Sequence, residues 1–154
     1  LQQYTTEHPD GLSYQHATAI KGNILIRNDA AIMISPEMYR NQIAEHDAYI
    51  LNAMQGGGIH SCGQIDFNIP EFFELPAMEC FDFGQSHLND IDAIYPLARE
   101  KKIPLIRLKV KREDLENLNI MKKYPTGVSL VYHAGSFEEA QQITVLYHRY
   151  TSDQ

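Results

Sequence analysis

His60 and Cys62 are the residues of this sequence whose types and spacing point most directly to chemistry. They lie in the segment GGGIHSCGQID, residues 56–66, and one residue separates them. In a strand, positions i and i+2 project from the same face, with their backbones about 6–7 Å apart. An imidazole nitrogen and a thiolate sulfur at that separation can reach one zinc ion, at about 2.0 and 2.3 Å. The pair therefore predicts a metal site, with a plain buried strand as the alternative.

A catalytic zinc site takes a third protein ligand and keeps one position open. His133, at the end of the last expected strand, is our first candidate, and Cys80, which we expect deeper in a strand, is the second. Asp29 and Asp82 are candidate acid–base groups or substrate anchors, with helix capping or loop hydrogen bonding as the alternative. We interpret four further histidines as surface residues: His8, His16, His46 and His148.

Alternating strand and helix patterns must position these residues. Residues 1–18 are polar and unperiodic, and we expect them to form a lead-in or loop. The strands are expected at residues 24–26, 58–62, 77–84, 103–110 and 127–135. The helices are expected at residues 36–54, 69–76, 89–102, 111–124 and 136–150. Ser35 is the expected cap of the first helix, and Asn89 or Asp90 caps the third.

This alternation predicts βαβ units on a parallel sheet. The strands are continuously apolar, which predicts helices on both faces of the sheet. In parallel α/β folds the functional face lies at the carboxyl ends of the strands. The residues expected at those ends are Asn28–Asp29, His60–Cys62, Asp82–His87, Lys109–Lys111 and His133. Polar and ligand-capable side chains therefore gather where chemistry is expected, although neither a GxGxxG nor a P-loop motif is present.

Composition narrows the function classes. The chain has 154 residues, which suits one domain, and its formal net charge of −7 argues against a nucleic-acid partner. No apolar run approaches the roughly 20 residues that span a bilayer. The only two cysteines, Cys62 and Cys80, cannot form a disulfide framework, and we expect them to be reduced in a cytoplasmic protein.

Three segments carry a resemblance to a known family: KGNILIRNDAAIMISPEMY, GGGIHSCGQIDFNIPEFFELPAMECFDFGQSHLNDIDAIY and KKIPLIRL. Together they resemble the carboxyl-terminal part of the uroporphyrinogen decarboxylase-like superfamily, from about Tyr14 to Tyr147, and most closely its members with an IH-x-CG strand. The resemblance implies a (β/α)8 TIM barrel. Such a barrel usually needs about 250 residues. We therefore expect a single α/β domain over residues 1–154 that is the C-terminal portion of a barrel, about five βα units, truncated at its N-terminal side.

The resemblance also implies two kinds of enzyme. Methyltransferases of the superfamily use zinc, held by His-x-Cys and a cysteine near the last strand, to activate a thiol that accepts a methyl group from a corrinoid. His60 and Cys62 match the first part of that pattern, whereas no cysteine follows Cys80 and His133 falls near the missing ligand. We therefore expect zinc-dependent methyl transfer from a corrinoid, presented by a partner protein, to a small-molecule thiol.

Two alternatives remain open. The superfamily's decarboxylases remove carboxylates from a tetrapyrrole porphyrinogen without a cofactor, but their arginine-rich motif belongs to a first strand that this sequence lacks. The second alternative is a non-catalytic barrel fragment or divergent binding module, in which His60 and Cys62 are structural remnants. About five strands alone would expose a sheet edge, so we expect self-association.

Overall fold

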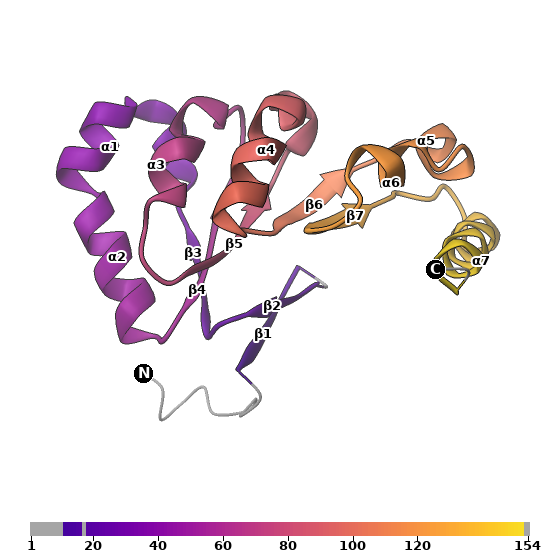
Figure 1. Cartoon of the computed structure of the whole chain (residues 1–154), viewed down its shortest axis with the longest axis horizontal. Coiled ribbons are helices and arrows are strands. Elements are labelled where there is room, and N and C mark those ends of the chain that lie inside the picture. Colours follow the sequence, from indigo (N-terminus) through magenta and orange to yellow (C-terminus); the bar gives the residue numbers. More distant parts are fainter. Residues whose placement is uncertain (1–10, 17, 153–154) are drawn as a thin grey trace.

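A five-stranded parallel sheet forms the centre of the structure, a computed structural model that describes residues 11–16 and 18–152 (Figure 1). The strands are β1 (Leu12–Gln15), β2 (Thr18–Lys21), β3 (Ile24–Arg27), β4 (Gly57–Ser61), β5 (Met78–Phe83), β6 (Leu105–Lys109) and β7 (Val128–Val131). The α-helices are α1 (Pro36–Gln42), α2 (Ala44–Ala53), α3 (Ile69–Phe73), α4 (Ile91–Lys101), α5 (Arg112–Glu116), α6 (Asn119–Lys123) and α7 (Phe137–Ser152). Short 3-10 helices span Asp29–Met33, Asp66–Asn68 and Ser86–Leu88.

The sheet order is β3-β4-β5-β6-β7, so each strand lies beside the next one in the chain. All neighbouring pairs are parallel, as expected for βαβ units. The α/β class and the five expected parallel strands are therefore confirmed. Because all five strands are parallel, their carboxyl ends lie at the same end of the sheet.

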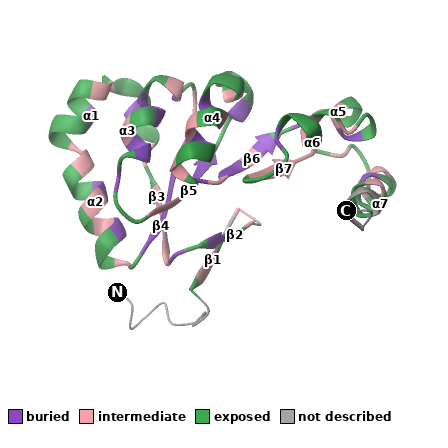
Figure 2. Ribbon diagram, in the orientation of Figure 1, coloured by how far each residue is buried: buried purple, intermediate pink, exposed green. Residues whose placement is uncertain are grey.

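The two faces of the sheet are covered differently, and the expectation of helices on both faces is wrong. On one face, Ile59, Phe81 and Leu105 pack in a single core with side chains from α1 to α4. On the other face, Ile20 of the β1–β2 hairpin packs against Cys80 and Ile106. Figure 2 shows the outcome, with the central strands buried and the outer helix surfaces exposed. The sequence signal misleads because apolar residues on the second face meet a hairpin rather than a helix.

The β1–β2 hairpin also corrects the expectation that residues 1–18 form a lead-in or loop. Its strands pair antiparallel, from Leu12 with Lys21 to Gln15 with Thr18. The hairpin lies against the sheet face opposite α1 to α4 (Figure 1). This packing brings the turn at His16 over the end of β4 and β5.

Local sequence signals explain where α1 and α4 begin. Ser35 accepts a hydrogen bond from the backbone N–H of Met38, and Asp90 accepts one from Ala93, so both expected caps are confirmed. The helix expected over residues 111–124 is instead divided into α5 and α6. The break falls at Leu118, which has a φ of 55°. A leucine in this left-handed region interrupts the helical hydrogen bonding.

Among the helices of the described part of the chain, none is long and apolar enough to cross a membrane.

Candidate metal centre

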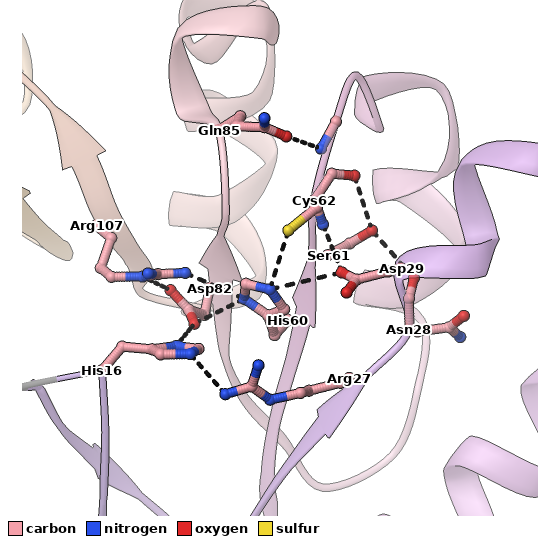
Figure 3. A network of polar contacts seen from close by, with 11 residues as sticks. His16, Arg27, Asn28, Asp29, His60, Ser61, Cys62, Asp82, Gln85 and Arg107 are labelled. Carbon is pink, nitrogen blue, oxygen red and sulfur yellow. Dashed lines mark hydrogen bonds and ion pairs between the residues drawn. The ribbon is translucent and has the colours of Figure 1, made fainter.

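Polar side chains from four neighbouring strands and the hairpin turn meet near the carboxyl ends of the strands (Figure 3). His60 on β4 lies in register with Arg27 on β3 and Asp82 on β5. In-register residues of a parallel sheet project from the same face, so these side chains share the face that the hairpin covers. Arg107 on β6 and His16 of the hairpin turn complete the group. The parallel sheet, the hairpin and a bulge in β6 together collect residues that are up to 91 positions apart, from His16 to Arg107.

Asp82 is the hub of this cluster. Its side chain is 2% exposed, and its Oδ2 lies 2.9 Å from His60 Nδ1 and 3.0 Å from His16 Nδ1. Its other oxygen accepts a hydrogen bond from Arg107 Nε at 2.5 Å. Burial raises the pKa of Asp82, but hydrogen bonds from His60, Arg107 and His16 outweigh it and hold the pKa below its ordinary value. Asp82 is thus a buried carboxylate that these donors keep ionised.

These contacts assign the proton on His60. A carboxylate has no proton to give, so the 2.9 Å contact with Asp82 requires that His60 Nδ1 donates. Arg107 Nη2 lies 3.1 Å from the same nitrogen, but two donors cannot bond to each other. A neutral His60 protonated at Nδ1 carries a free lone pair on Nε2. That nitrogen faces Cys62 and Asp29.

Cys62 and Asp29 lie on the other side of the His60 ring. Cys62 Sγ is 3.4 Å from His60 Nε2, and Asp29 Oδ1 is 3.5 Å from the same nitrogen. Asp29 also accepts a hydrogen bond from the backbone N–H of Cys62 at 2.8 Å, which ties the end of β3 to the end of β4. Room for the thiol comes from Gly84, where a Cβ atom would lie only 2.5 Å from Cys62 Sγ.

Electrostatics keep the Cys62 thiol protonated in the metal-free protein. Burial and the neighbouring Asp29 carboxylate raise the pKa of Cys62, Asp82 adds to the increase, and Arg107 offsets only part of it. A bound cation reverses this effect, because a metal ion lowers the pKa of a coordinating thiol. The thiol therefore needs a local positive charge to become a thiolate near neutral pH.

A second hydrogen-bond network fixes the end of β3. Asp47 on α2 is buried, and its Oδ2 accepts hydrogen bonds from Asn28 Nδ2 at 2.9 Å and from the Tyr39 hydroxyl at 2.8 Å. The carbonyl oxygen of Asn28 accepts a hydrogen bond from Ser61 Oγ at 3.0 Å. Because Asn28 immediately precedes Asp29, this network also fixes the position of the Asp29 backbone.

Two groups of residues in the described part of the chain could hold a metal ion: His16, His60 and Asp82, and Asp29, His60 and Cys62. They use opposite nitrogens of His60. Tetrahedral zinc would separate a nitrogen and a sulfur ligand by about 3.5 Å, and a nitrogen and an oxygen ligand by about 3.4 Å, given the usual bond lengths. The separations of 3.4 and 3.5 Å from His60 Nε2 match these values, so Cys62 and Asp29 lie at suitable distances from His60 to share a zinc ion with it. The 2.9 and 3.0 Å contacts around Asp82 are hydrogen-bond distances instead.

The structure brings some of the expected site residues together and leaves others apart. His60, Cys62, Asp29 and Asp82 form one connected cluster, as their places at strand ends imply. His133, our first candidate for a third ligand, belongs to neither group of ligand atoms among the described residues. The third donor beside His60 and Cys62 is Asp29, which we expected as an acid–base group or a substrate anchor.

The second candidate ligand, Cys80, also belongs to neither group. It is 2% exposed, it packs against Ile20 and Ile106, and burial raises its pKa to about 12. This placement confirms the expectation that Cys80 lies deep in a strand. A thiol in these surroundings is a packing residue.

Sequence reasoning missed three residues of the cluster: His16, Arg27 and Arg107. His16 was expected at the surface, yet its side chain is 24% exposed and contacts Asp82 and Arg27. Arg107 is not among the residues that the sequence analysis expects at the site. No local motif marks His16 or Arg107. The position of His16 depends on the packing of the hairpin, and that of Arg107 depends on a bulge in β6. Of the other histidines, His46 and His148 are exposed as expected, and His8 lies outside the described residues.

Comparison of the chain with protein-family models, with curated proteins and with solved structures finds no match. The resemblance to the uroporphyrinogen decarboxylase-like superfamily therefore remains an expectation that rests on the quoted segments. The fold and the cluster define an α/β chain with a five-stranded parallel sheet and a possible metal site at the carboxyl ends of its strands.

Proposed function

We propose that this chain is a zinc-dependent enzyme in which Asp29, His60 and Cys62 hold the metal and the open position takes a substrate thiol. One observation carries the proposal: His60 Nε2 lies 3.4 Å from Cys62 Sγ and 3.5 Å from Asp29 Oδ1, while its other nitrogen is held by Asp82. A ligating histidine whose second nitrogen donates to a carboxylate is the usual arrangement in zinc proteins. Three protein ligands and one open position are typical of catalytic zinc.

Exposure of the ligands favours access by a small molecule. The His60 side chain is 4% exposed, whereas that of Asp29 is 52% exposed, so one side of the proposed centre is buried and the other faces solvent. When bound, zinc would lower the pKa of a coordinated thiol, so that a thiolate exists near neutral pH. Asp82 and Arg107 orient His60, and Asp29 fixes the backbone of Cys62.

The reaction class follows from the resemblance. We propose methyl transfer from a corrinoid, presented by a partner protein, to a small-molecule thiol. The sequential strand order, with α1 to α4 on one face, supports the further proposal that the sheet is part of a (β/α)8 barrel, because barrel strands follow one another in this way. In such a barrel the cluster would lie at the end where active sites form.

Metal content tests the proposal directly. The purified chain is loaded with zinc, dialysed and analysed by plasma mass spectrometry, beside Cys62→Ala and the matched control Cys80→Ala. We expect one zinc per chain in the unaltered protein and in Cys80→Ala, and loss of zinc in Cys62→Ala. Cobalt substitution adds a spectroscopic readout, because a thiolate ligand gives a charge-transfer band that Cys62→Ala should abolish.

Absence of zinc from the unaltered, loaded protein would refute the metal-dependent function. Zinc retained by Cys62→Ala would place the metal elsewhere, such as at His16, His60 and Asp82. An Asp29→Ala variant separates the two ligand groups further, because Asp29 belongs only to the group with Cys62.

A second candidate function arises from the same contacts. Cys62, His60 and Asp82 are arranged as a nucleophile, a base and an orienting carboxylate, with separations of 3.4 and 2.9 Å. Two observations favour the metal instead. The pKa of Cys62 is raised, which disfavours the nucleophilic thiolate. The backbone N–H groups beside the thiol, which would be needed to stabilise an oxyanion, already bond elsewhere: that of Cys62 to Asp29 and that of Gly63 to Gln85. Rapid alkylation of Cys62 in metal-free protein near neutral pH, abolished in His60→Ala, would support the nucleophile.

A further inference from the structure

Arg107 occupies an unusual backbone position within β6. Its φ is 63°, in the left-handed region that side chains other than glycine, asparagine and aspartate rarely adopt. Three steps along β6, from Leu105 to Leu108, match two steps along β7, from Val128 to Leu130. One extra residue has therefore been inserted into β6, which is a β-bulge.

The bulge changes the face from which Arg107 projects. In a regular strand, Leu105 and residue 107 would share one face and Ile106 and residue 108 the other. Instead, Leu105 and Leu108 both belong to the core beneath the helices, and Ile106 belongs to the cluster beneath the hairpin. Arg107 thereby reaches Asp82 and His60, on the face that it would otherwise point away from.

The contacts of Arg107 show what this placement accomplishes. Its Nε donates to Asp82 Oδ1, which leaves Oδ2 to accept from His60 Nδ1. The hydrogen bond on one oxygen restrains rotation of the carboxylate, so the other oxygen stays beside the imidazole. The guanidinium also offsets the cost of burying the charge of Asp82, which is 2% exposed. The strained bulge thus supports a group that positions a proposed metal ligand.

We propose that Arg107 is a positioning residue that, through Asp82, holds His60 in the tautomer protonated at Nδ1 and so keeps Nε2 free to bind metal. This inference rests on the proposed function only for its consequence, metal binding. The tautomer itself is a property of the metal-free protein.

The test uses two variants that tolerate the backbone differently. Arg107→Asn suits the left-handed conformation and removes the guanidinium, whereas Arg107→Lys restores the positive charge but not the planar fork. Arg99→Asn, which replaces an arginine that contacts Tyr95 on α4, is the matched control. Imidazole tautomers are read by 15N NMR in metal-free protein, with His60 assigned from a His60→Gln variant, and zinc affinity is read by chelator competition.

In the unaltered protein we expect the His60 spectrum of a ring protonated at Nδ1. In Arg107→Asn we expect averaging between the two tautomers, a zinc affinity about 10–100-fold lower, and a cooperative unfolding transition that shows an intact fold. Arg107→Lys should recover part of the affinity, and Arg99→Asn should change neither readout.

The inference is overturned if the unaltered protein carries the His60 proton on Nε2, or if Arg107→Asn keeps both the tautomer and the zinc affinity. In the latter case the bulge serves only the fold. A locked tautomer that Arg107→Asn releases, in a protein that binds no zinc, would support the positioning role and refute the proposed function. If Arg107→Asn does not fold, the tautomer and the zinc affinity of Arg107→Lys decide the question. The positioning role is refuted if both equal those of the unaltered protein and if no other replacement of Arg107 that folds changes them.

Discussion

Asp82→Asn is the substitution whose consequences the structure defines most closely. Three donors converge on its two carboxylate oxygens: Arg107 Nε on one, and the Nδ1 atoms of His60 and His16 on the other. A side-chain amide of the same shape has one oxygen, and its NH2 group can only donate. At least one of the three donors must then face another donor. The substitution also removes the negative charge that balances Arg107.

The expected cost has two separate parts. Removal of one partner from a buried ion pair costs about 3–5 kcal/mol of unfolding free energy. Arg107 is 20% exposed and regains some hydration, so we expect a loss near the lower limit, about 3 kcal/mol. Loss of the carboxylate that orients a ligating histidine lowers metal affinity about 10–100-fold. Urea unfolding measures the first part, and chelator competition for zinc measures the second.

Asp92→Asn is the matched control for this experiment. Asp92 also accepts from a cation and a hydroxyl, Lys123 at 2.6 Å and Tyr124 at 2.5 Å, but its side chain is 58% exposed. Exposed ion pairs contribute at most about 1 kcal/mol. We therefore expect a small loss of stability and unchanged zinc affinity. The reasoning about Asp82 is refuted if Asp82→Asn loses no more stability than Asp92→Asn and keeps the same zinc affinity.

Three further predictions test separate parts of the structure. In native protein a thiol reagent should modify Cys62 and spare Cys80, because Cys80 is 2% exposed and has a pKa of about 12. Zinc should protect Cys62 from the reagent. Peptide mass spectrometry measures both, and faster modification of Cys80 would contradict the assignment. Tyr39→Phe removes a buried hydrogen bond to Asp47 and should cost about 1–3 kcal/mol in urea unfolding; a cost below about 0.5 kcal/mol would contradict that contact. Hydrogen bonds from a lysine and a tyrosine lower the pKa of Asp92, so the stability that its carboxylate adds is present above its ordinary pKa of about 4 and disappears as the pH falls through the lowered value. The difference in unfolding free energy from Asp92→Asn should therefore vanish in acid, and a difference that grows in acid would contradict the sign.

The sheet could be predicted from the sequence because its signals are local. Apolar runs separated by capped helices place five strands in order, and Ser35 and Asp90 cap the helices as their residue types suggest. The parallel topology then implies that the ends of the strands meet, which is why Asp29, His60 and Asp82 could be chosen in advance. The hairpin was missed because its strands, LSYQ and TAIK, are half polar and lack the apolar runs that mark β3 and β7, which are equally short.

The ligand set could not be predicted in full, because it depends on side-chain direction. His133 follows a strand end as Asp29 does, and sequence alone ranks it higher as a zinc ligand because it is a histidine. The structure favours Asp29 because β3 is the direct neighbour of β4, whereas β7 is three strands away. Arg107 was missed because a bulge reverses the face that alternation assigns to it.

The proposed metal ligands and the residues that orient them lie on different strands, so substitutions in the two groups should affect metal binding differently. The proposed ligands are His60 on β4, Cys62 directly after β4 and Asp29 after β3, whereas β5 and β6 carry the residues that orient His60, namely Asp82 and Arg107. Substitutions in the first group remove a ligand atom, and those in the second leave the ligand atoms in place. Loss of metal should therefore be complete in the first group and graded in the second. Equal loss of metal in both groups of substitutions would mean that the cluster only stabilises the fold. A true metal site should distinguish the residues that bind the metal from those that orient them.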